Sequence, residues 1–176
     1  VIKDDKEAVK WYRKAADVGY AKAMVNLGLM YAFGKGVIED DKEAVTWYRR
    51  AAEVGYAKAM VHLGLMYATG EGVIEDDVEA FAWFNVAAEN GQKTAAKLRD
   101  NIKKTMTPEQ IAEGQKRSRE IMKSISKNCF ARVGNSSMVL LISGASFCSL
   151  LRTDFKLVCW SFHSSRTGFA AATISN

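Results

Sequence analysis

Only a few side chains in this sequence have the types and spacing that catalysis or metal binding requires. Of the two histidines, His62 takes the place of Asn26 in a nearly identical copy of the same segment. No second histidine, cysteine or paired carboxylate stands at ligand spacing from it, so we expect a surface side chain rather than a catalytic or metal-binding one. The nucleophile and zinc-hydrolase motifs are missing as well. The sequence therefore predicts no catalytic residue and no bound metal.

Paired aspartates and short glycine segments are the other candidates for chemistry. Aspartates are paired at 4–5, 40–41 and 76–77, and Gly-x-Gly occurs at 34–36 and 70–72. A calcium loop needs Asp-x-Asp-x-Asp-Gly, and a phosphate loop needs a longer glycine pattern after a strand. Because each aspartate pair comes just before a predicted helix, with a glutamate at capping-box spacing, we expect helix capping instead. The glycines are expected to form turns, and no cofactor is predicted.

The formal charge of +5 does not indicate a nucleic-acid partner, because the charge is unevenly distributed. Residues 1–126 hold 20 basic and 19 acidic side chains, a net charge of +1, whereas residues 127–176 hold five basic and one acidic, a net charge of +4. A groove that follows phosphates should concentrate positive charge on one element, and the first segment has none. We therefore expect no nucleic-acid binding.

The elements that position these residues form a repeat. Residues 1–36 and 37–72 are identical at 29 of 36 positions, and a third copy starts at Val73 before it diverges. In each unit, apolar residues recur at spacings of three, four and seven in two successive segments, about 6–18 and 21–33 in the first copy. This periodicity predicts a helix-turn-helix pair that must stack on its neighbours to bury its apolar side.

Each copy carries one tryptophan on the apolar stripe of its first predicted helix. These residues are Trp11, Trp47 and Trp83, and we expect all of them in the core. The three copies correspond to residues 1–36, 37–72 and 73–106.

The array is expected to end with polar elements that face water. The second helix of the third copy carries Arg99 and Asp100 where the first copy has leucine and glycine. After it, Thr107 and Pro108 supply the start of a capping helix, which we place at 107–124. The repeat domain is therefore predicted to span residues 1–124.

The segment WYRKAADVGYAKAMVNLGLMYAFGKGVIEDDKEA, with its paired alanines, Leu-Gly-x-x-Tyr run and Gly-x-Gly-Val turn, resembles the Sel1-like repeat family. The resemblance covers about residues 1–124 and implies an all-α, right-handed α/α superhelical solenoid, similar to tetratricopeptide arrays. It also implies a non-enzymatic scaffold or adaptor that binds a protein or peptide on its concave face. Cysteine-rich relatives linked to β-lactam binding or hydrolysis supply the alternative function. Their hallmark pair of cysteines in each repeat is missing from residues 1–128.

Positions that differ between nearly identical copies are the best guide to a binding surface. Positions 10, 14 and 17 share one face of the first helix and are polar in both copies, which indicates a solvated outer wall. Positions 26 and 33 share a face of the second helix, which the family resemblance places on the concave side. The alternative is that copies drift wherever side chains are exposed. The hypothesis is that eight residues line the partner groove: Lys22, Asn26, Leu29, Phe33, Lys58, His62, Leu65 and Thr69.

The last segment, residues 125–176, follows different rules. It is rich in serine, holds all three cysteines and contains an apolar stretch from Met138 to Leu151, which is shorter than the roughly 20 residues that span a bilayer. A β-prone segment, a membrane-associated tail, a disordered tail and a frameshifted or read-through product are all open interpretations. The first unit enters at the turn before its second family helix, so we expect a missing upstream helix. Cytoplasmic and periplasmic or secreted locations both stay open.

Overall fold

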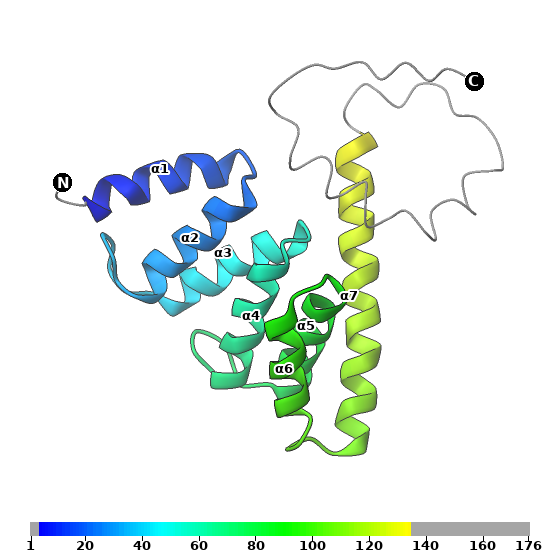
Figure 1. The fold of residues 1–176 in the computed structure, drawn as a ribbon. Coiled ribbons are helices and arrows are strands. Elements are labelled where there is room, and N and C mark those ends of the chain that lie inside the picture. The colour runs from blue at the N-terminus through cyan, green and yellow to red at the C-terminus, as the bar shows by residue number, and fades with distance from the viewer. Residues whose placement is uncertain (1–3, 135–176) are drawn as a thin grey trace, which may run out of the picture. The chain divides into compact units, whose positions relative to one another are not determined.

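The computed structural model describes residues 4–134, with side chains up to residue 128, so the apolar stretch of the tail and the side chains of the three cysteines lie outside the described part. Seven α-helices follow one another in this range, and no strand occurs within it (Figure 1). They are α1 (Asp5–Asp17), α2 (Ala21–Ala32), α3 (Asp41–Glu53), α4 (Ala57–Thr69), α5 (Asp77–Glu89), α6 (Lys93–Ile102) and α7 (Pro108–Gly134). The predicted all-α repeat fold is confirmed for the described residues.

An aspartate caps the first helix of every copy. The Asp4 carboxylate accepts hydrogen bonds from the backbone N–H groups of Lys6 and Glu7, at 3.0 and 3.2 Å. At the starts of α3 and α5, the Asp40 carboxylate accepts from one backbone N–H group and that of Asp76 accepts from two. Because these contacts satisfy backbone donors that a helix leaves unpaired at its first turn, the aspartates act as caps, as predicted.

In the first two units, the glycine segment after the second helix folds back onto the start of the unit's first helix. Gly36 and Gly72 have φ angles of 73° and 69°, in the left-handed region that other residues rarely adopt. A Cβ atom at Gly36 would also collide with the backbone of Asp5, and one at Gly72 with the backbone of Asp41. The repeat therefore needs glycine at this position both for backbone conformation and for space.

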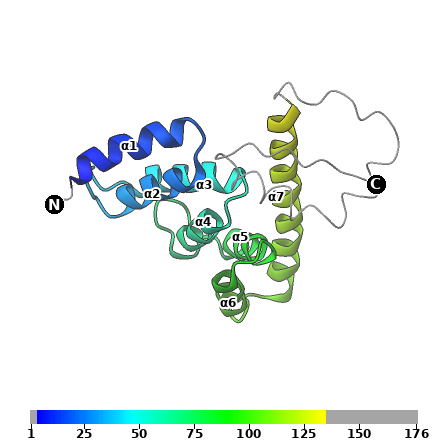
Figure 2. The ribbon, with the colours of Figure 1, turned by 45° about the horizontal axis from the view of Figure 1, so that its top comes forward.

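Helices α1 to α6 pack in chain order, each on the helix before and after it (Figure 2). Where α2 meets α3, Gly28 lies against the ring of Tyr48, and an added Cβ would come within 2.6 Å of that ring. The α4–α5 contact repeats this arrangement with Gly64 and Phe84, at the same distance. An aromatic ring placed on a glycine thus sets the close approach of both helix pairs.

The tryptophans do not all lie in the core. Trp47 and Trp83 are buried, with 7% and 6% of their surface exposed, whereas 61% of Trp11 is exposed. The prediction for Trp11 is therefore wrong. The physical reason is that α3 and α5 are packed between two neighbouring helices, whereas α1 packs on α2 alone.

Helix α7 does not continue the stack after α6 but packs along α5 and touches α3 (Figures 1 and 2). The contact places Gly114 against the ring of Phe81 and buries Ser118, whose hydroxyl donates to the Gly114 carbonyl at 2.7 Å. On α5, Ala82 and Val86 are fully buried. In the first two copies, the position of Ala82 holds Lys10 and Thr46, and the position of Val86 holds Lys14 and Arg50. All four of these side chains are exposed. The outer wall, which we predicted to face solvent, does so only in the first two copies.

The capping helix is longer than the sequence suggested. It begins at Pro108, after reciprocal contacts in which the Thr107 N–H donates to the Gln110 side chain and the Gln110 N–H donates to the Thr107 hydroxyl. It continues beyond Ser124 to Gly134, because no glycine or proline interrupts the sequence between these two residues.

Candidate functional site

The eight residues of the hypothesised groove, here called the variable stripe, lie on the second helices of the first two copies, α2 and α4, or at the residue that ends α2. Their spacing of four, three and four places the members on each helix along one face. The exposed members are Lys22, Phe33, Lys58, Leu65 and Thr69. The partly buried members are Asn26, Leu29 and His62.

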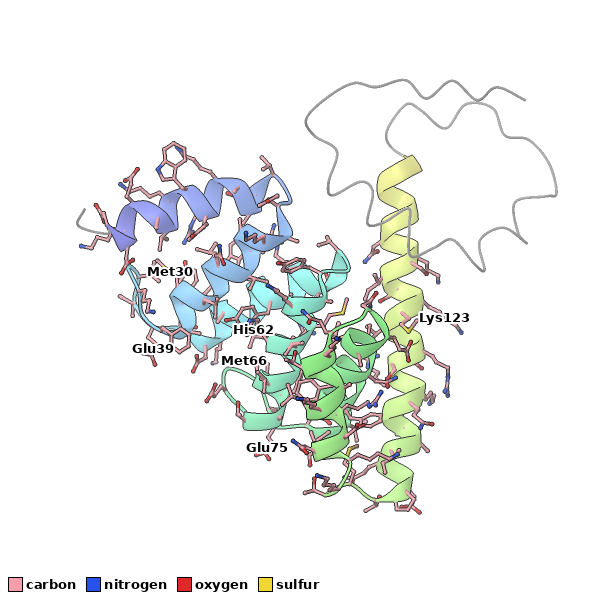
Figure 3. All side chains as sticks on the ribbon, viewed as in Figure 1. Met30, Glu39, His62, Met66, Glu75 and Lys123 are labelled. Carbon is pink, nitrogen blue, oxygen red and sulfur yellow. The ribbon has the colours of Figure 1, made fainter. Side chains whose placement is uncertain are left out.

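The two halves of the variable stripe are joined through α3, which packs against both α2 and α4. The buried ring of Tyr48 on α3 lies beside Gly28 of α2 on one side. It also stacks on the imidazole of His62 of α4, which Figure 3 labels, with ring centroids 5.0 Å apart and an angle of 16° between the planes. His62 is therefore not a free surface side chain as expected. It is a partly buried member of an aromatic stack.

Burial changes the ionisation of this stack. It lowers the pKa of His62 below its ordinary value of 6.5, and the positive charge of Lys58 lowers it further. Burial also raises the pKa of the Tyr48 hydroxyl, with a smaller contribution from the charge of Asp41. At neutral pH both rings are therefore uncharged, which is compatible with their close stacking.

The exposed part of the variable stripe combines positive charge with apolar surface. Lys22 and Lys58 are both exposed, and none of the eight residues is acidic. Phe33 leaves 63% of its surface exposed and Leu65 leaves 37%. The ammonium of Lys35 lies 5.4 Å from the centre of the Phe33 ring, which adds a third positive charge beside the stripe.

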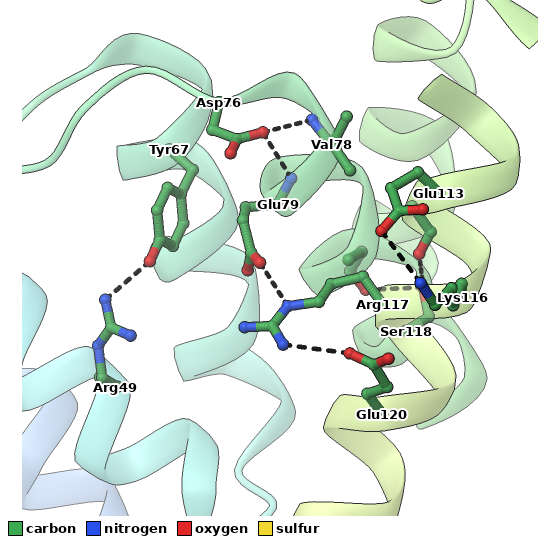
Figure 4. A network of polar contacts seen from close by, with 12 residues as sticks. Arg49, Tyr67, Asp76, Val78, Glu79, Glu113, Lys116, Arg117, Ser118 and Glu120 are labelled. Atoms are coloured by element: carbon green, nitrogen blue, oxygen red, sulfur yellow. Dashed lines mark hydrogen bonds and ion pairs between the residues drawn. The ribbon is translucent and has the colours of Figure 1, made fainter. Parts of the chain in front are cut away.

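A repeated arginine–tyrosine contact escaped the comparison of copies. The Arg49 guanidinium donates to the Tyr67 hydroxyl at 2.7 Å (Figure 4), and Arg13 makes the same contact with Tyr31. These residues are identical in the two copies, so a search for differing positions could not find them. The third copy replaces the pair with asparagine and lysine, and Asn85 instead accepts from Arg99 at 3.3 Å.

A second polar cluster fastens α7 to α5 (Figure 4). The Arg117 guanidinium donates to the carboxylate of Glu79 on α5 and to that of Glu120 on α7, the latter at 3.3 Å. On the same face, the hydroxyl of buried Ser118 also lies 3.4 Å from the Ala82 carbonyl. Arg117 and Ser118 join α7 to α5, and Glu120 pairs with Arg117 within α7, so the cluster explains how α7 is held.

Metal ligands and surface hollows are the remaining features at which chemistry could take place. Within residues 4–128, no three His, Cys or acidic side chains gather in a group that could hold a metal ion. Two shallow surface hollows lie beside α7, and none of the variable-stripe residues lines them. None of the helices in the described range combines the length and apolarity that crossing a membrane demands.

Comparison with known proteins agrees with the geometry. The sequence profile of the Sel1 repeat matches residues 1–20, 21–56 and 57–92, which together make up more than half of the chain. The two complete matches contain α2 with α3 and α4 with α5, which are the pairs joined by a ring on a glycine. No curated protein sequence resembles the chain closely enough to count as a match.

Two solved structures share the fold. The crystal structure of c5321, a protective antigen of uropathogenic Escherichia coli strains with an SLR fold, is 33% identical, with a TM-score of 0.68, over 81% of this chain and 31% of that one. The Sel1 repeat protein from Oxalobacter formigenes is 44% identical, with a TM-score of 0.52, over 54% of this chain and 39% of that one. The chain thus spans well under half the length of either protein. With its three profile matches and these two neighbours, the chain belongs to the Sel1 repeat family.

Proposed function

We propose that the chain is a non-enzymatic scaffold that binds a protein or peptide partner through the variable stripe. Sel1 repeat proteins are in general protein-interaction scaffolds, and the finer assignment depends on one observation. In two copies that are otherwise nearly identical, two positions of this stripe differ, Asn26 against His62 and Phe33 against Thr69, while the fully buried residues do not. Two differences on one face of the second helix, beside the unchanged Lys22 and Lys58, are what we expect of a surface adapted to a partner.

The chemistry of the stripe specifies the kind of partner. Exposed Lys22 and Lys58 stand one repeat apart, with Phe33 and Leu65 as apolar contacts. A peptide with acidic side chains around an aromatic or aliphatic anchor would complement this surface. The β-lactam-binding alternative receives no support from the described residues, and we do not propose it.

The test uses peptides selected from a random display library for binding to the full chain. Their affinities are then measured for the unmodified chain and for the double variant Lys22→Glu with Lys58→Glu. We expect this variant to bind at least an order of magnitude more weakly, because it opposes acidic side chains with like charge. Enrichment of acidic residues in the selected peptides is a second expected result.

The matched control is Lys6→Glu with Lys42→Glu. These two exposed lysines also stand one repeat apart, in the first turns of α1 and α3, so the net charge changes equally. The control should bind the peptides as the unmodified chain does. If both double variants weakened binding to the same degree, the effect would be one of net charge, and the variable stripe would not be the binding site.

A further inference from the structure

Two isoleucines lie exposed on the loops that join α2 to α3 and α4 to α5. Ile38 and Ile74 each leave 89% of their surface exposed, more than any other large apolar side chain in the described residues. The residues just before them, Val37 and Val73, pack against the core. A single exposed apolar residue is ordinary on a protein surface, but here both loops expose one at the same position. Packing within the described array therefore does not explain the two isoleucines.

The two loops are ordered and adjacent. In each loop, the N–H of the capping aspartate donates to the carbonyl of a tyrosine in the preceding helix, at 3.0 and 2.9 Å. Gly72 of the second loop lies directly against the backbone of Asp41, where the first loop ends. Figure 3 labels Glu39 and Glu75, which follow the two isoleucines along the chain. The isoleucines are thus presented by neighbouring loops whose backbones are fixed.

Carboxylates surround the two isoleucines. Residues 34–41 hold three acidic and one basic side chain, a net charge of −2, and residues 70–77 hold four acidic and no basic ones, a net charge of −4. All seven carboxylates are at least partly exposed, and none of them forms an ion pair with another described residue. Glu75, Asp76 and Asp77 line one of the surface hollows beside α7. The isoleucines and carboxylates of residues 38–41 and 71–77 are here called the isoleucine edge.

We propose that the isoleucine edge docks a basic segment of a partner protein, with aliphatic side chains over Ile38 and Ile74 and lysine or arginine side chains beside the carboxylates. Apolar contacts combined with opposite charges are the usual composition of a protein interface. The negative charge of the edge would repel nucleic acid and anionic lipid. The edge shares no residue with the variable stripe, so this inference does not depend on the proposed function.

A second copy of this chain is a weaker candidate for the occupant. Its surface that combines apolar groups with positive charge is the variable stripe, where Lys22, Lys58 and the neighbouring Lys35 supply three positive charges. The isoleucine edge carries seven carboxylates, so a second copy would leave most of them unmatched. Charge complementarity therefore favours a partner segment that is more basic than the stripe.

The test uses three synthetic peptides of equal length, built from repeats of Lys-Leu-Lys-Lys, Lys-Ser-Lys-Lys or Glu-Leu-Glu-Glu. Fluorescence anisotropy measures their binding to the full chain. Because the chain has a formal net charge of +5, only a local acidic surface attracts a basic peptide. We expect the lysine–leucine peptide to bind at least an order of magnitude more tightly than the lysine–serine peptide, and to bind more weakly as the salt concentration rises.

The apolar contribution is tested by Ile38→Ser with Ile74→Ser. This variant should bind the lysine–leucine peptide about an order of magnitude more weakly, and it should bind the glutamate–leucine peptide as the unmodified chain does. Its matched control, Phe33→Ser with Leu65→Ser, removes two exposed apolar side chains from the variable stripe and should leave binding of the lysine–leucine peptide unchanged. Circular dichroism checks that each variant keeps its helix content.

The charge contribution is tested by Glu39→Gln with Glu75→Gln, which should also weaken binding of the lysine–leucine peptide. The matched control is Asp17→Asn with Glu53→Gln. These two exposed carboxylates also stand one repeat apart, but they end α1 and α3, whereas the loops of the edge precede or follow the other ends of these helices. The control should bind the peptide as the unmodified chain does.

The proposal is overturned if the lysine–leucine peptide does not bind, if the isoleucine variant binds it as tightly as the unmodified chain, or if either control loses as much affinity as its test variant. Equal binding of the lysine–leucine and lysine–serine peptides would overturn it too, because the isoleucines would then contribute nothing. Self-association of the unmodified chain that the isoleucine variant abolishes would also overturn it, because the occupant would be a second copy.

Discussion

At the scale of single residues, the ring of Tyr48 links three helices, since it lies on Gly28 of α2 and stacks on His62 of α4. The position of His62 in this stack is occupied by Asn26 in the preceding copy. One repeat therefore carries a titratable group at a place where its neighbour carries a neutral one. This difference makes the stability of the array depend on pH.

We predict that His62 destabilises the folded protein on mild acidification. Because its pKa is lowered by burial and by Lys58, the unfolded chain takes up a proton before the folded protein does. The free energy of unfolding should therefore fall as the pH drops from 6.5 towards the lowered pKa. Urea titrations at several pH values measure it. His62→Asn, which copies the residue at position 26, should flatten the curve in this window, and an unchanged slope would contradict the prediction.

The sequence alone predicts the role of some of these residues but not of others. The aspartate caps were predictable because a cap depends on residues two or three positions away. The Tyr48–His62 stack was not, because it joins residues of two helices whose relative rotation is set by packing. A lone histidine exchanged for asparagine gave no signal of its partner.

At the scale of elements, equivalent helices differ in how many neighbours they have. Helix α1 packs on α2 only, whereas α3 packs between α2 and α4. The same tryptophan is consequently exposed in one copy and buried in the next. This contrast allows a test within one chain.

Trp47→Ala should lower the free energy of unfolding by about 3–5 kcal/mol, because it opens a cavity in the stack. Trp11→Ala should lower it by about 1 kcal/mol or less, because its ring is largely exposed and gains only a surface contact with Lys14, 4.7 Å from its centre. Chemical unfolding of the two variants, each compared with the unmodified chain, measures both changes. Equal losses would show that α1 is covered in solution.

The path of α7 was the element that sequence could not predict. Its capping box and apolar spacing indicate a helix, but periodicity does not say which neighbour the apolar face meets. A signal was present in the third copy, where Ala82 and Val86 replace polar residues of the outer wall. These changes predict that the outer wall is covered in the third copy, but they do not say which segment covers it.

At the scale of the whole described array, stability should be distributed along the stack rather than uniform. Contacts join helices that are adjacent in sequence, apart from those of α7, and such arrays behave as a chain of neighbour interactions. Helices α1 and α6 each pack on a single helix, and α6 buries only Ala95. The ends are therefore held by fewer interfaces than the middle.

We predict that amide exchange in the unmodified chain is fastest in α1 and α6 and slowest in α3 and α5. Helix α5 should be the most protected, since α4, α6 and α7 all pack on it. Hydrogen exchange followed by mass spectrometry gives the rate for each helix. Equal protection of all the helices would mean that the array unfolds as one unit and would contradict this gradient.

The charged pair of α6 also bears on assembly. A stack with an exposed apolar face at one end and a complementary face at the other would join head to tail. Repeated joining without closure produces an open fibre. Arg99 and Asp100, bonded to each other at 2.8 Å, occupy the positions that hold leucine and glycine in α2 and α4. The apolar end at α1 therefore finds no counterpart at α6 of an identical molecule. Arg99 and Asp100 therefore act against head-to-tail joining of identical chains through α1 and α6.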